Sequence, residues 1–100
     1  LSIRVDLQHA KEQVWLQLEG ALSAAHAEGL GQRILDSLAG TRNRLILDLK
    51  DLHWDQVDDV RPLLKKLAAY RSRIRLVLPR LAAAHPELIL LASLFHSYKG

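Results

Sequence analysis

The side chains best suited to do chemistry are concentrated in one acidic segment. Four carboxylates, Asp51, Asp55, Asp58 and Asp59, fall within nine residues of a chain whose net charge is +3. Carboxylate oxygens suit Ca²⁺ or Mg²⁺, but this spacing lacks the alternating Asp or Asn positions, central Gly and terminal Glu of an EF-hand loop. Metal binding is therefore a minor alternative for this segment, and we expect no metal and no cofactor.

Acid–base catalysis is the second chemistry that this segment could support. His53 and Asp55 could move protons, but no nucleophile lies near them in the sequence, and the chain has no glycine-rich phosphate loop. The five histidines are dispersed and form no pair with the spacing of a zinc site. We therefore assign no catalytic residue and predict that the chain is not an enzyme.

The elements that position the acidic segment can be predicted from hydrophobic periodicity. Alternation with period two predicts two strands joined as a hairpin, and apolar steps of three and four residues predict helices. In chain order the predicted elements are strands at 3–7 and 14–18, a helix between Ser23 and Gly40, a strand at 45–49, a helix from Val60 to Arg71, a strand at 74–78 and a helix from about Pro86 to Ser97.

The element order β-β-α-β-α-β-α predicts the fold class. Right-handed crossovers place the helices against the sheet, and the opening hairpin supplies one antiparallel strand. The expected fold is an α/β sandwich with a mixed sheet of about four strands and three helices. A chain of 100 residues has room for one core, so we expect a single domain spanning residues 1–100.

Composition narrows the class of protein further. The chain is 49 % hydrophobic and 25 % charged, which is typical of a folded domain. It contains no cysteine, no signal peptide and no apolar run long enough to span a membrane, so we expect a cytoplasmic location without membrane insertion. The absence of methionine suggests a domain cut from a longer protein. Although the pI is about 9.6, the basic residues are scattered, which argues against nucleic acid as a partner.

The element order and two local motifs resemble the STAS family, the module of bacterial anti-sigma-factor antagonists and of the cytosolic tails of sulfate transporters. In that family a strand with a Gly-containing turn precedes the first helix, as Val14-Trp-Leu-Gln-Leu-Glu-Gly-Ala-Leu-Ser23 does here. The family's third strand ends in Asp-Leu and leads to an Asp-Ser-Ser-Gly-like motif, and Asp48-Leu49 and the segment to Asp59 align with it without a gap. The resemblance covers nearly the whole chain and implies the fold and a protein-binding role.

The departures from the family fall on the phosphorylation motif. The motif's Asp falls on Gln56, its two serines on Val57 and Asp58, and its glycine on Asp59. Asp58 therefore stands at the position of the serine that a partner kinase phosphorylates in antagonists of this family. Because a carboxylate has no hydroxyl, the resemblance does not carry phosphorylation over to this chain.

The two aspartates at the expected start of the second helix allow more than one interpretation. Asp58 and Asp59 would meet unpaired backbone N–H groups and the positive end of the helix dipole, which stabilises a helix by about 0.3–1 kcal/mol for each carboxylate. Asp58 could in addition partly mimic a phosphoserine, which carries more charge and more acceptor oxygens. Trp54 likewise has two interpretations, as a plug at the sheet edge or as a hot spot for a partner.

The sequence thus predicts a non-catalytic regulatory module that binds another protein through the segment from Lys50 to Asp59 and the helix after it. Expected partners are a kinase-like anti-sigma factor, another regulator or a transporter subunit, and a homodimer is also considered. One alternative is a cytosolic STAS domain of an anion or lipid transporter, and another is a nucleotide- or anion-binding module that uses the N-terminus of the second helix. The expected partner-binding residues are Asp51, His53, Trp54, Asp55, Val57, Asp58, Asp59 and Arg61.

Overall fold

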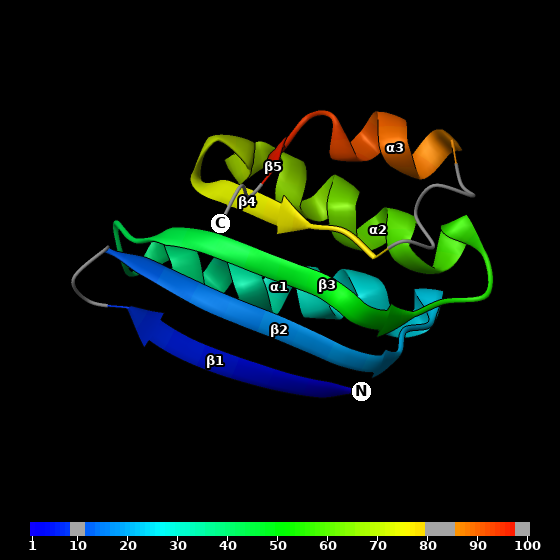
Figure 1. The fold of residues 1–100 in the computed structure, drawn as a ribbon, viewed down its shortest axis with the longest axis horizontal. Helices are drawn as coiled ribbons and strands as arrows, with labels where there is room; N and C mark the ends of the chain where they lie inside the picture. Colours follow the sequence, from blue (N-terminus) through cyan, green and yellow to red (C-terminus); the bar gives the residue numbers. More distant parts are fainter. Residues whose placement is uncertain (9–11, 80–85, 98–100) are drawn as a thin grey trace.

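The computed structural model describes residues 1–8, 12–79 and 86–97, and its elements follow the predicted order (Figure 1). The predicted α/β class and the order β-β-α-β-α-β-α are confirmed, and a two-residue strand follows the last helix. The elements are β1 (Ser2–Gln8), β2 (Gln13–Ala21), α1 (Ala24–Ala39), β3 (Arg44–His53), α2 (Val57–Leu67), a 3-10 helix (Ala68–Arg73), β4 (Ile74–Val77), α3 (Pro86–Ala92) and β5 (His96–Ser97).

The five strands form one mixed sheet in the order β1-β2-β3-β4-β5. β1 is antiparallel to β2, and the pairs β2–β3, β3–β4 and β4–β5 are all parallel. Because each parallel connection steps to the next strand in the same direction, right-handed crossovers place their helices on the same face of the sheet. Figure 1 shows α1 and α2 side by side on that face, with α3 next to α2.

The core lies between this sheet face and the helices, and it is built mainly from leucine. The apolar stripe predicted for the first helix, Ala27, Leu30, Ile34 and Leu38, is buried. Hydrophobic burial of these side chains is the main stabilising term, at about 1.5–3 kcal/mol for each large aliphatic residue. The buried side chains from the strands and from α2 are Leu16, Leu18, Leu45, Leu47, Leu49, Leu52, Val60, Leu63, Leu64, Leu67, Ile74 and Leu76.

The helices α1 and α2 approach each other closely at Gly31. A Cβ atom built on Gly31 would lie 2.9 Å from Cβ of Lys66 and 3.6 Å from Cδ1 of Leu63. Gly29, two residues earlier on α1, has no atom within 4 Å of the same position. The absence of a side chain at residue 31 therefore allows the two helix backbones to pack at this distance.

Arg73 fastens the C-terminal end of α1 to the chain that follows α2. Its guanidinium donates hydrogen bonds to the backbone carbonyls of Leu38 at 3.2 Å, Thr41 at 2.5 Å and Asn43 at 2.9 Å. The last carbonyl groups of a helix have no hydrogen-bond donor within the helix. The carbonyl groups of the turn that follows also need donors. Arg73 supplies these donors, although it lies at least 30 positions away in the sequence from each carbonyl that it binds.

The strand that leads into the acidic segment is longer than predicted. β3 runs to His53 instead of ending at Leu49, so only residues 54–56 connect it to α2. The extension follows from β2, which reaches Ala21 and pairs with β3 as far as His53. Leu52, which lies in the extended part, is 1 % exposed. The prediction that this strand ends at Leu49 was therefore wrong, since burial of Leu52 and pairing with β2 hold residues 50–53 in the sheet.

The last two helices end earlier than predicted. α2 stops at Leu67 and continues as the 3-10 helix to Arg73, and α3 stops at Ala92. After α3, short-range hydrogen bonds from Leu94 N–H to Leu91 and from Phe95 N–H to Ala92 tighten the chain into a turn. Phe95 is then buried in the core, and His96 pairs with β4. The prediction that this helix reaches Ser97 is wrong. The backbone of His96 and Ser97 pairs with β4 instead of continuing the helix.

The sheet face away from the helices carries a buried carboxylate. Asp48 in β3 is 3 % exposed, and its two oxygens accept hydrogen bonds from the indole Nε1 of Trp15 at 3.3 Å and from the backbone N–H of Lys50 at 3.0 Å. A buried charge is tolerated when such donors compensate its lost hydration. These bonds explain why an aspartate interrupts the apolar run of the central strand.

Candidate partner-binding site

Most of the predicted partner-binding residues lie near the C-terminal edge of the parallel strands, where α1 and α2 both begin. The backbone N–H of Leu22, just before α1, donates to the carbonyl of His53 at the end of β3 at 2.9 Å. This bond holds the two strand-to-helix connections against each other. The N-termini of both helices and the acidic segment therefore share one end of the molecule.

The structure divides the predicted residues by exposure. Asp51, His53, Asp55 and Asp58 are exposed, and Val57, Asp59 and Arg61 are half-buried. Trp54 is 6 % exposed and belongs to the hydrophobic core. Of the two interpretations of Trp54, the structure agrees with the plug at the sheet edge, because a side chain this deeply buried has little surface for a partner.

Asp59 connects the N-termini of the two helices. One of its carboxylate oxygens accepts a hydrogen bond from the backbone N–H of Gln56 at 3.1 Å, and the other accepts from the backbone N–H of Ala24 at 3.3 Å. The N–H of Asp59 in turn donates to the carbonyl of Gln56 at 2.9 Å. Asp59 thus caps α2 and also supplies an acceptor to the first residue of α1, which is a structural task.

Asp58 occupies the first turn of α2 and pairs with a different residue from those that Asp59 binds. Its side chain is 65 % exposed and forms an ion pair with Arg61 on the next turn, and the same guanidinium also pairs with Glu87 on α3. The Arg61 side chain is 29 % exposed, and its two ion pairs link α2 to α3. Exposed pairs of this kind contribute little to stability, so Asp58 remains available for a partner.

Asp51 lies apart from the helix N-termini. It is in β3, and its carboxylate accepts a hydrogen bond from Nε2 of Gln17 on the neighbouring strand β2 at 2.6 Å. Asp51 is therefore part of the sheet, whereas Asp58 and Asp59 are in the first turn of α2. Within residues 1–8, 12–79 and 86–97, no three His, Asp or Glu side chains gather closely enough to hold a metal ion.

The N-terminus of α2 is poorly suited to bind an anion. Its first turn carries two carboxylates, Asp58 and Asp59, and Asp59 already accepts the N–H of the capping residue. A phosphate placed there would meet like charge, which counteracts the favourable helix dipole. This geometry disfavours the nucleotide- or anion-binding alternative.

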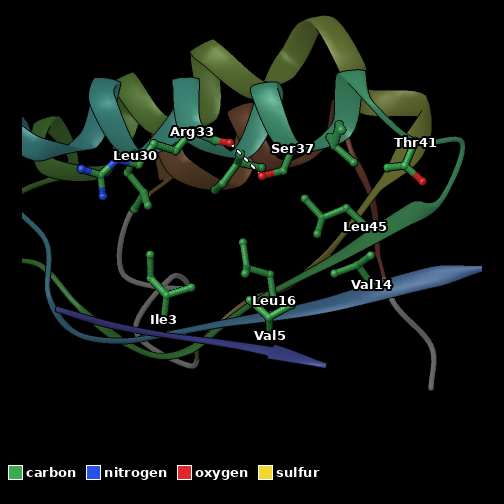
Figure 2. Close-up of a pocket in the computed structure, with 11 residues that line it drawn as sticks. Ile3, Val5, Val14, Leu16, Leu30, Arg33, Ser37, Thr41 and Leu45 are labelled. Atoms are coloured by element: carbon green, nitrogen blue, oxygen red, sulfur yellow. Dashed lines mark hydrogen bonds between the residues drawn. The ribbon is translucent and has the colours of Figure 1, made fainter. Parts of the chain in front are cut away.

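The structure also has a concave surface at the other edge of the sheet. The hydrophobic pattern of the sequence did not predict it. An open groove of about 200 Å³ lies between β1 and α1. Figure 2 shows the side chains that line it. Apolar side chains of Ile3, Val5, Leu16, Leu30 and Ile34 line it, with Arg33, Ser37 and Thr41 along the helix side. The sequence shows the alternating apolar residues of the first strand, but only the structure shows that Ile3 and Val5 stay exposed.

Comparison with known structures decides the fold. The chain is similar to the crystal structure of an antisigma-factor antagonist STAS domain from Rhodobacter sphaeroides, with a TM-score of 0.61 and 18 % sequence identity over 76 % of this chain and 84 % of that chain. This chain has the STAS fold. No protein-family model and no curated protein sequence matches it.

This similarity confirms the fold that the sequence resemblance implied. Asp58 stands in the first turn of the second helix, at the end of the molecule where both helices begin. No helix in the described ranges has both the length and the apolar character needed to cross a membrane.

Proposed function

We propose that this STAS-fold chain is a non-catalytic regulatory module of the anti-sigma-factor-antagonist type, which binds a protein partner through the N-terminal end of α2. The partner class is a kinase-like anti-sigma factor or a related regulator in the cytoplasm. The similarity to a domain described as an antisigma-factor antagonist supports the class of function. The binding surface consists of the exposed residues His53, Asp55 and Asp58, with Arg61 at its border.

The observation that carries the proposal is the exposed carboxylate of Asp58. It occupies the place of the phosphorylated serine in the family resemblance, and its side chain is 65 % exposed in the first turn of α2. A carboxylate there presents a permanent negative charge that no kinase or phosphatase can add or remove. The module is therefore held in one signalling state, and the partner recognises that charge.

The same surface is poorly built for catalysis. His53 and Asp55 are both exposed to solvent. A general base normally works within hydrogen-bond reach of a partner that orients it, in a site that excludes water. This arrangement supports a binding role over an enzymatic one.

The experiment compares charge reversal inside and outside the proposed surface. The immobilised chain, its Asp58→Lys variant and an Asp36→Lys variant are exposed to extract of the native cell, and the retained proteins are identified by mass spectrometry. Asp36 is an exposed aspartate on α1, hydrogen-bonded to Gln32 at 2.8 Å, so its reversal changes net charge equally at another place. A partner should be retained by the parent and by Asp36→Lys and lost with Asp58→Lys.

The retained protein is then purified, and its affinity is measured by titration calorimetry. We expect Asp58→Lys to weaken binding at least about tenfold, which corresponds to roughly 1.4 kcal/mol. Asp58→Ser removes the charge but restores a hydroxyl, and it should weaken binding until the serine is phosphorylated. Equal affinity of the parent and Asp58→Lys would contradict the proposed surface and leave Asp58 only a structural role at the helix start.

A further inference from the structure

The first strand leaves one of its two edges open in the described part of the structure. β1 pairs with β2 through an unbroken register from Ser2 opposite Glu19 to Gln8 opposite Gln13. Its other edge has no neighbouring strand in the sheet order. Edge strands are often protected against pairing with another chain by short length, a proline, a bulge or charged side chains. β1 has no proline and no bulge, and its two charged residues, Arg4 and Asp6, have opposite signs, so its seven residues form a regular template for a strand of complementary charge.

The apolar face of β1 is incompletely covered. Ile3 is 43 % exposed and Val5 is 61 % exposed, although both belong to the sheet face that packs against helices. Figure 2 shows these two side chains on the β1 side of the groove, facing α1 across open space. The groove is therefore open along the same edge that lacks a strand, and one occupant could cover both.

We propose that the occupant is a second copy of this chain, bound through an antiparallel β1–β1 pair around a two-fold axis at Val5. In this register Val5 faces Val5, and every residue from Ser2 to Gln8 lies opposite a residue of the other copy, because residue 5 is the middle of the strand. The two five-stranded sheets would then become one continuous sheet. The second copy would also bring its own Ile3 and Val5 to the open side of the groove.

Charge complementarity selects this register. With Val5 at the centre, Arg4 of each copy lies directly opposite Asp6 of the other, so the interface contains two opposite-charge pairs. A centre at Arg4 or at Asp6 would instead place like charges opposite each other. A shift by one residue would mix the apolar and polar faces of the strand. The Arg4 side chain is 73 % exposed and meets Glu19 of its own chain at 3.5 Å, so it lies at the surface where a second copy would reach it.

The test uses reciprocal charge reversal. Sedimentation velocity and light scattering are measured over a range of protein concentrations for the parent chain, Arg4→Asp, Asp6→Arg, an equimolar mixture of these two variants, and the control Arg71→Asp. Arg71 is an exposed residue of the 3-10 helix that leads into β4, and β2 and β3 separate β4 from β1 in the sheet. Circular dichroism confirms that each variant is folded.

The parent and Arg71→Asp should form a dimer. Each single variant of β1 converts two opposite-charge pairs into two like-charge pairs, so its dimer dissociation constant should rise at least about tenfold. In the mixture each variant supplies the charge that the other lacks, and the dimer should return.

Three results would overturn the proposal. A parent chain that is monomeric at every concentration would leave the groove to an occupant other than a second copy. A dimer that is insensitive to both single variants would place the interface elsewhere. Single variants that dissociate and remain dissociated in the mixture would exclude the register centred at Val5. None of these results bears on Asp58, because the proposed partner surface lies at the N-terminal end of α2.

Discussion

Replacing Gly31 by alanine tests how closely α1 and α2 are packed. The added Cβ would lie 2.9 Å from Cβ and 3.1 Å from Cγ of Lys66, whereas carbon atoms in favourable contact are about 3.5–4.0 Å apart. Because Cβ of Lys66 is fixed to its helix backbone, a rotamer change cannot remove the clash. The helices must therefore separate by roughly 0.5–1 Å, the shortfall between these distances.

The expected free-energy change has two terms of opposite sign. Alanine is favoured over glycine within a helix by about 0.5–1 kcal/mol. Overpacking of a close contact costs about 1–3 kcal/mol. Gly29→Ala on the same helix gains the first term without the second, because nothing lies within 4 Å of its new Cβ. The difference in stability between the two variants therefore isolates the clash, and it should be about 1–3 kcal/mol in favour of Gly29→Ala.

Urea unfolding followed by tryptophan fluorescence and far-ultraviolet circular dichroism measures this difference. In thermal unfolding, Gly31→Ala should have a Tm at least about 4 °C below that of Gly29→Ala. Combining Gly31→Ala with Lys66→Gly, which removes the opposing Cβ, should recover part of the loss in a double-mutant cycle. If the two alanine variants are equally stable, the close approach of α1 and α2 at residue 31 is wrong.

Three further predictions concern single hydrogen-bonded groups. Asp59→Ala should lower the free energy of unfolding by about 1–3 kcal/mol, because two backbone N–H groups lose a charged acceptor, whereas the exposed neighbour Asp58→Ala should stay within about 0.5 kcal/mol of the parent; equal effects in urea unfolding would refute the assigned roles. Arg73→Ala should cost about 1–3 kcal/mol in the same assay and Arg73→Lys less, since an ammonium can keep some of the three carbonyl bonds. A lysine variant as unstable as the alanine variant would argue against carbonyl capping. Trp15→Phe should cost about 1–3 kcal/mol by removing the indole donor to the buried carboxylate of Asp48, and it should cost markedly less in an Asp48→Asn background, as a double-mutant cycle would show.

Features that depend on nearby residues could be predicted from the sequence. Alternation in β2 and the three- and four-residue steps in α1 and α2 record which face of each element is buried, whereas alternation in β1 marks a strand whose apolar residues Ile3 and Val5 stay exposed. The element order and the core stripe of α1 are confirmed. The end of α3 could not be predicted in the same way. Residues 93–97 continue a helical pattern of apolar residues, but pairing of His96 with β4 competes with the helix and replaces it.

The candidate site was less predictable because its geometry depends on contacts between distant residues. The sequence indicates that Asp59 lies at a helix start, but its bond to Ala24 joins residues 35 positions apart. The separation of Asp51 from Asp58 likewise depends on the extension of β3, which is held by β2. The groove beside β1 exists because α1 does not cover the first strand, and only the tertiary arrangement shows this.

The pair of helices α1 and α2 is fastened at three heights along its length. Asp59 joins the N-termini, Gly31 in the middle of α1 meets Lys66 near the C-terminal end of α2, and Arg73 holds the C-terminal end of α1 to the segment after α2. Sliding or tilting one helix against the other would break at least one of these contacts. If a partner docks at the end of α2 as proposed, moving α2 against α1 would cost the free energy of these contacts. The proposed recognition is therefore expected to depend on the charge and shape of the surface more than on a shift of α2.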